Sequence, residues 1–193
     1  MAHAPLLIQL VEGLTVMSFF RRIFWIFFRL VLAARYRVRV RGLDQLKGLK
    51  GPVLVLPNHP GYIDPILVFT VLWPRLRMRP MIYTGNFKNL FFRLVARLLN
   101  AHKVPDMDQA SKEARSQANL AVAGAIEGLK QGQNHILWPA GHVWRSGGVE
   151  HLGAARAAAD ILQAVPEAAV VLVRTRGVWA VRSPGPRRGP SRR

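Results

Sequence analysis

A chain of 193 residues, half of them hydrophobic, has the length of one domain with a sizeable core. It contains no cysteine, which excludes a disulfide framework, a thiolate nucleophile and a cysteine zinc site. The formal net charge of +18 indicates an acidic partner, which could be nucleic acid, anionic lipid or a phosphorylated substrate.

The first 35 residues predict a helix that lies on a membrane surface. The apolar residues 1–20 lack the positive start and cleavage site of a signal peptide. The run 14–34 has about the length of a membrane span, but Arg21, Arg22 and Arg29 interrupt it and share one helical side. The other side carries Phe19, Phe20, Ile23, Phe24, Phe27 and Phe28. We expect the arginines to face anionic headgroups, with Trp25 at the headgroup boundary; a buried core helix and a true span are the alternatives.

The next segments predict an exposed strand, a loop and a buried strand. Basic and apolar residues alternate from Tyr36 to Arg41, as in a half-exposed strand. Glycines and lysines between Gly42 and Pro52 are typical of a connecting loop. The four apolar residues 53–56, half of them β-branched, then predict a buried strand that Pro57 ends.

The loop after this strand carries His59 and Asp64, with four residues between them. Asp64 and Pro65 suit the N-cap and first turn of a helix over residues 66–72 that ends near Pro74. Imidazole can take a proton from a hydroxyl near neutral pH, and a carboxylate on its other nitrogen orients it. Two structural interpretations stay open, in which Asp64 only caps the helix and His59 is a hydrogen-bonded structural histidine.

The remaining pattern alternates strands and helices. Strands are expected at 80–83, 134–138 and 169–173, and helices at 90–99, from Asp106 or Asp108 to Lys130, and at 153–163. The many alanines of the long helix suit close packing on a sheet. This order predicts an α/β domain with a mixed, mostly parallel sheet flanked by helices.

Two later loops could bind an anion. Gly141 and two further glycines let backbone N–H groups approach a phosphate, and Arg145 can add a two-pronged contact. Arg174 and Arg176 emerge at the carboxyl end of the last strand, where ligands of α/β sheets bind. An ordinary surface loop is the alternative for the glycine-rich turn.

Three segments resemble the PlsC-like glycerolipid acyltransferases, the lysophospholipid and glycerol-phosphate acyltransferase family. The spacing Asn58-His59-x4-Asp64 is similar to the first motif of that family. Residues 137–148 lie where the family has a Phe-Pro-Glu-Gly-Thr-Arg motif, and residues 170–177 are similar to the late strand that closes the site. The segments occur in the family order, and the resemblance covers roughly residues 36–180.

The chain departs from the family pattern at four positions. Gly61 stands where many members have serine, Ala140 replaces the motif glutamate, and His142 replaces threonine. Arg145 lies two places later than the usual arginine. These changes leave the expected base in place but keep open a weakened or inactive enzyme.

The resemblance implies an O-acyltransferase in which His59 is the general base and Asp64 orients it. The substrate-binding residues that it implies are Asn58, Gly61, Gly141, His142, Arg145, Ser146, Arg174 and Arg176. The acyl donor would be acyl-CoA or acyl-carrier protein and the acceptor a lysophospholipid or glycerol phosphate, without a covalent acyl-enzyme, a metal or a tightly bound cofactor. The enzyme would work on the cytoplasmic face of the inner or plasma membrane.

Three parts of the chain follow from this interpretation. They are a membrane-associated helical segment at 1–35, an acyltransferase-like domain at 36–181 and a basic, disordered tail at 182–193 rich in Arg, Pro, Gly and Ser. Two other functions remain candidates. One is an inactive acyltransferase-like protein that binds membranes, and the other is a basic nucleic-acid-binding module, although no reader motif supports it.

Overall fold

The computed structural model describes residues 4–83, 90–104, 112–143 and 156–178. Its helices and strands are α1 (Ala4–Arg35), the 3-10 helix η1 (Leu43–Gly48), β1 (Val53–Pro57), α2 (Asp64–Leu76), β2 (Arg79–Tyr83), α3 (Leu90–Leu98), β3 (His102–Val104), α4 (Lys112–Lys130), β4 (His135–Ile136), α5 (Ala157–Ala164) and β5 (Ala169–Val173). Several expectations fall outside the described residues. They concern the tail 182–193, the side chains Arg145 and Ser146, and the helix starts near Asp106, Asp108 and Gly153.

The five strands form one sheet in the order β3-β2-β4-β1-β5. Each pair of neighbouring strands is parallel, so the expected α/β class is confirmed and the sheet is parallel throughout its described part. β1 lies between β4 and β5, with Val55 opposite Ile136 and Pro57 opposite Val173. Because the strands are parallel, the carboxyl ends of these three strands meet at the same edge of the sheet.

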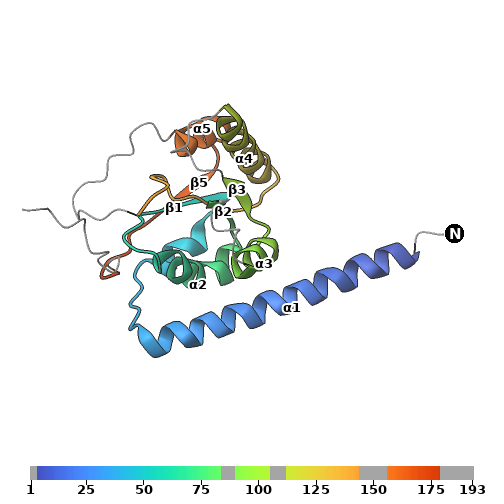
Figure 1. The fold of residues 1–193 in the computed structure, drawn as a ribbon, viewed down its shortest axis with the longest axis horizontal. Helices are drawn as coiled ribbons and strands as arrows, with labels where there is room; N and C mark the ends of the chain where they lie inside the picture. Colours follow the sequence, from blue (N-terminus) through green and yellow to red (C-terminus); the bar gives the residue numbers. More distant parts are fainter. Residues whose placement is uncertain (1–3, 84–89, 105–111, 144–155, 179–193) are drawn as a thin grey trace, which may run out of the picture.

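Helices cover both faces of the sheet (Figure 1), with α4 and α5 on one side and α1, α2 and α3 on the other. Val53 and Val55 of β1 pack against Val68 and Leu72 of α2, whereas Leu54 faces the opposite layer of α4 and α5. This alternation is that of a strand buried on both faces. The expected packing of the α4 alanines is confirmed, since Ala125 is fully buried in this second layer.

Two polar side chains dock α1 on the domain. Arg21 Nε donates to the Leu98 carbonyl in the last turn of α3, at 2.7 Å. Trp25 Nε1 donates to the Thr70 carbonyl of α2, at 2.8 Å. Thr70 would normally accept from the N–H four residues later, but that residue is Pro74, which has none. The indole therefore satisfies the carbonyl that the proline leaves without a helical partner.

This docking corrects the expectation for α1. Arg21 and Trp25 face the protein, not lipid headgroups, because half-buried N–H groups need acceptors and helix ends leave carbonyls free. The outward side of α1 carries an exposed apolar stripe, defined by Phe19, Phe20, Ile23, Ile26, Phe27 and Leu30. Among the described residues, no helix is both long enough and apolar enough to cross a bilayer.

Other local expectations were wrong. Residues 36–42 form no strand, because alternating polarity stabilises a strand only beside a partner, and the described sheet ends at β5 and β3. The loop 42–52 contains η1, and the short strand β3 was not predicted. α2, in contrast, ends at Leu76, near Pro74 as expected, and Trp25 binds the one carbonyl that the proline leaves free.

Two histidines pack together on the face of the sheet that α4 covers. His102 of β3 and His135 of β4 stack with ring centroids 5.2 Å apart, and their Nε2 atoms are 3.2 Å apart. His135 Nδ1 lies 3.1 Å from the Gln133 carbonyl, which can only accept, so this nitrogen carries the hydrogen. Neutral His135 then accepts at Nε2 from His102. Gly124 and Gly128 of α4 leave room for the two rings.

This arrangement predicts a loss of stability in acid. Burial lowers the pKa of His135 to about 4, opposed by the Gln133 carbonyl and assisted by the charges of His102 and Arg79. Between pH 6.5 and 4 the unfolded chain binds more protons than the native one, so stability rises with pH across this window. The shift corresponds to about 3 kcal/mol. Urea unfolding should show a flatter pH dependence in His135→Gln, whereas the exposed His142→Gln should behave as wild type.

Candidate active site

The site begins where β1 ends in Pro57 and the chain turns towards α2. The Asp64 N–H donates to the Gly61 carbonyl at 3.3 Å, which closes the turn around the buried Gly61. The N-cap of α2 is Ile63, so Asp64 is the first helical residue and not the capping residue that its sequence position predicted. Its carboxylate makes no cap hydrogen bond, which leaves it available to the loop.

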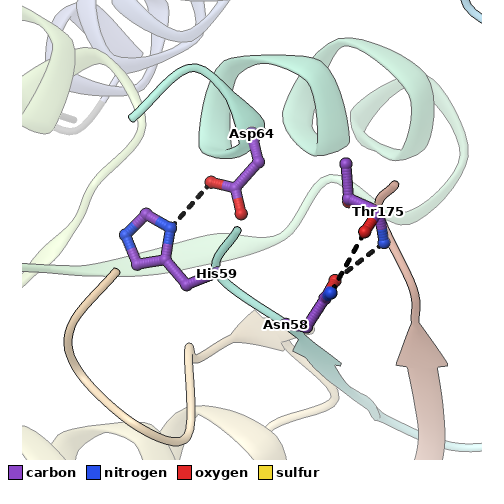
Figure 2. A network of polar contacts seen from close by, with 4 residues as sticks. All are labelled: Asn58, His59, Asp64 and Thr175. Atoms are coloured by element: carbon purple, nitrogen blue, oxygen red, sulfur yellow. Dashed lines mark hydrogen bonds and ion pairs between the residues drawn. The ribbon is translucent and has the colours of Figure 1, made fainter. Parts of the chain in front are cut away.

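The structure brings His59 and Asp64 together, as their spacing predicted. Figure 2 shows the carboxylate of Asp64 facing the His59 ring, with Nδ1 2.9 Å from Oδ1. The approach is bent away from hydrogen-bond alignment, as is common before a substrate tightens a catalytic contact. Asp64 is fully buried, whereas 18% of the His59 side chain is exposed. The pair therefore combines a hidden carboxylate with an imidazole that a substrate can reach.

Burial controls the charge of the carboxylate. It raises the pKa of Asp64 above the ordinary value, while the contact and charge of His59 and the indole of Trp138 lower it in part. Both Asp64 oxygens are buried without a well-aligned hydrogen bond among the described residues. A buried carboxylate with so little support is destabilised as an anion, and its contact with the His59 ring only partly offsets this effect of burial.

Trp138 is the third side chain of this cluster, although the sequence did not mark it as a site residue. Its ring lies 5.9 Å from the His59 ring, at an angle of 49°. Its Nε1 is buried, and the indole favours the charged form of Asp64. The signal was available in part: Trp138 follows β4, the neighbour of β1 in the parallel sheet, so it comes out at the same edge as His59.

Asn58 ties the loop to the end of β5. Its side-chain amide donates to the Thr175 carbonyl at 3.1 Å and accepts from the Thr175 N–H at 2.7 Å (Figure 2). The Asn58 N–H also donates to the Val173 carbonyl, at 3.1 Å. Asn58 thus positions the His59 loop. Its side-chain amide is bonded to the backbone of Thr175, whereas the sequence had suggested that it contacts substrate. Thr175 was not predicted, because the two residues are 117 positions apart.

The other expected binding residues lie on neighbouring turns. Gly141 has a φ of +69° and donates its N–H to the Trp138 carbonyl at 3.0 Å, so it forms a tight turn. His142 is exposed on this turn, with Nδ1 2.8 Å from the Ala140 carbonyl. Arg174 and Arg176 are exposed on either side of Thr175. Arg145 and Ser146 lie outside the described residues.

The cluster can perform proton transfer. The carboxylate contacts Nδ1 of His59, so Nε2 is the nitrogen that a hydroxyl group could approach. Two exposed arginines follow β5, the strand next to the one that carries the histidine, and add positive charge to the same edge. Within the described parts of the chain, no three His, Cys, Asp or Glu side chains gather as they would around a metal ion.

Comparisons with known proteins agree with this fold. The family model described as Acyltransferase matches residues 37–174, whereas no curated protein matches the chain. A solved structure with the same fold is the 1-acyl-sn-glycerophosphate (LPA) acyltransferase, PlsC, from Thermotoga maritima, with a TM-score of 0.57 and 18% identity. The match covers 78% of this chain and 54% of that one. The chain therefore spans about half the length of this structural relative.

Proposed function

The chain belongs to the Acyltransferase family, and from this premise we propose that it transfers a fatty acyl group from an acyl thioester to a hydroxyl of a lysophospholipid or glycerol phosphate. The observation that carries the proposal is the His59–Asp64 contact of 2.9 Å at the carboxyl edge of the parallel sheet. PlsC of Thermotoga maritima, whose fold the chain shares, is by its description an acyltransferase of such a phosphorylated lipid.

In the proposed reaction His59 Nε2 removes the proton of the acceptor hydroxyl as its oxygen attacks the thioester carbonyl. The tetrahedral intermediate then expels the thiolate, which takes the proton from the imidazolium. The products are an ester and a free thiol, and no covalent acyl-enzyme forms. The Asp64 carboxylate at Nδ1 holds the ring and stabilises the imidazolium while it exists. Acyl-CoA and acyl-carrier protein both supply the required thioester.

The acceptor phosphate would be held by the basic turns beside His59. Arg174 and Arg176 flank Thr175, whose backbone is fixed to Asn58, so their backbone positions relative to the His59 loop are set by two hydrogen bonds. The turn that ends at Gly141 begins at Trp138, which contacts the same histidine. Arginine binds phosphate with two parallel hydrogen bonds, which suits an acceptor that must present one hydroxyl to a fixed base.

The exposed apolar stripe of α1 supports action at a membrane. Six large apolar side chains on the outward side of a helix, in a chain of net charge +18, match the pattern of a helix that rests in the interface of an anionic bilayer. A lipid acceptor resides in that interface. We propose that the protein works on the cytoplasmic face of the inner or plasma membrane.

The test is a transfer assay with a labelled acyl thioester and a panel of lysophospholipids and glycerol phosphate on anionic vesicles. We expect label in a diacyl or monoacyl product and release of free thiol in equal amount. Vesicle binding without any labelled product would refute the proposed activity. That outcome would favour the second candidate, an inactive membrane-binding relative. The observation that favours this candidate is Ala140, which stands in place of the motif glutamate.

A further inference from the structure

An apolar groove of about 530 Å³ runs between α1 and α3, apart from the His59 cluster. From α1 it is lined by three phenylalanines and an isoleucine, namely Phe20, Ile23, Phe24 and Phe27. Its volume falls within the range of about 300–1,000 Å³ of small-molecule sites. Phe20, Ile23 and Phe27 belong to the apolar stripe, so the groove is continuous with the surface proposed to meet the bilayer.

Positive charge marks one end of the groove. α3 contributes Leu94, Val95 and Leu98 to its wall, together with Arg97, whose side chain is exposed. Arg21 reaches the same end of α3, where its Nε donates to the Leu98 carbonyl. Within the described residues neither guanidinium pairs with a carboxylate. An apolar groove with the exposed Arg97 at one end is complementary to a molecule with a long hydrocarbon chain and an anionic head.

We propose that the α1–α3 groove binds one acyl chain of an anionic phospholipid of the bilayer, with the phosphate on Arg97. The inference rests on the proposed contact with a membrane and deepens it, since it assigns a lipid site distinct from the reacting acceptor. Burying hydrocarbon favours binding by about fourfold per methylene, and guanidinium–phosphate contacts supply the preference for an anionic head. The bound lipid would join α1 to α3 and fix the protein on its membrane.

Photo-crosslinking tests the site directly, without use of the transfer reaction. Vesicles of phosphatidylcholine carry a trace of phosphatidylglycerol or phosphatidylcholine with a photoreactive acyl chain, and label is counted per vesicle-bound protein and mapped on peptides. We expect the phosphatidylglycerol label to concentrate in residues 20–27 and 94–98. Label spread evenly over the stripe, or equal for both lipids, would overturn the proposal.

Two pairs of matched variants test separately the binding of the lipid phosphate and the binding of the acyl chain. Arg97→Gln should lower the ratio of anionic to zwitterionic label about fivefold or more, whereas Arg93→Gln, one turn away on α3 and outside the groove, should keep that ratio. Leu94→Trp fills the groove and should remove most label, whereas the equally exposed Leu90→Trp should not. Equal effects within either pair contradict the site.

These outcomes are distinct from failure of the proposed function. If wild type does not sediment with anionic vesicles, the membrane contact itself fails, and the lipid site fails with it. If wild type sediments and transfers acyl groups but the variant pairs behave alike, the proposed function stands and the groove is not a lipid site. A dimer that forms in solution and is broken by Leu94→Trp would instead assign the groove to a second copy of the chain.

Discussion

Replacing His59 with alanine is expected to lower acyl transfer by about 10²–10⁴, the usual worth of a general base. The side chain is the exposed member of a pair whose other member is buried, so a hydroxyl group can reach it and not Asp64. The loss should fall on kcat, with little change in KM for either substrate, because the base acts on the transition state. The measurement is the initial rate with labelled thioester on anionic vesicles.

Two controls distinguish lost chemistry from a damaged fold. His59→Ala leaves Asp64 without the neighbour that favours its charged form, so some loss of stability at neutral pH is expected. His59→Gln fills the same space and should be equally inactive. Added imidazole should restore part of the rate in the alanine variant, where space is open, and none in the glutamine variant. Rates of both variants close to wild type would exclude His59 as the base.

The sequence predicted features that depend on residues close together in the chain. β5 has its expected bounds, because five apolar residues rich in valine favour a strand, although Val170 and Leu172 are exposed in it. The contact of His59 with Asp64 was also local, since a short loop from a strand to a helix holds both ends close. Tyr36–Arg41 had an equally regular pattern and forms no strand, which shows that periodicity does not supply a pairing partner.

What the sequence did not predict depends on contacts between distant residues. Trp25 meets Thr70 because Pro74 leaves that carbonyl free, and nothing near Trp25 signals this. Asn58 meets the backbone of Thr175 only through the pairing of β1 with β5. Trp138 reaches His59 only through the register of β1 with β4. The first contact depends on the packing of α1 on α2 and the other two on strand order, and the spacing of residues along one chain specifies neither.

Asp64→Asn should lower the rate of acyl transfer without lowering the stability of the fold. Asparagine keeps the shape but cannot stabilise an imidazolium, so we expect transfer to fall by about 10²–10⁴. The fold, however, disfavours the charge that the substitution removes, because burial raises the pKa of Asp64. The variant should therefore be at least as stable as wild type at neutral pH, as measured by urea unfolding.

The pH dependence of the free energy of unfolding tests whether the charged carboxylate destabilises the fold. Native Asp64 has a higher pKa than the same residue in the unfolded chain, so between the two values the native state binds more protons. Wild type should gain stability relative to Asp64→Asn as pH falls through that window, and the difference should vanish below it. A variant less stable than wild type at pH 7 would mean that the carboxylate stabilises the fold, contrary to its burial without aligned hydrogen bonds.

The activity of the double variant tests whether His59 and Asp64 act as one unit. Residues that act as one unit do not lose activity additively, so His59→Ala combined with Asp64→Asn should be no slower than His59→Ala alone. If the double variant is slower by the product of the single losses, Asp64 acts on the reaction independently of the histidine. The 2.9 Å contact would then be structural, and a different group would have to orient the base.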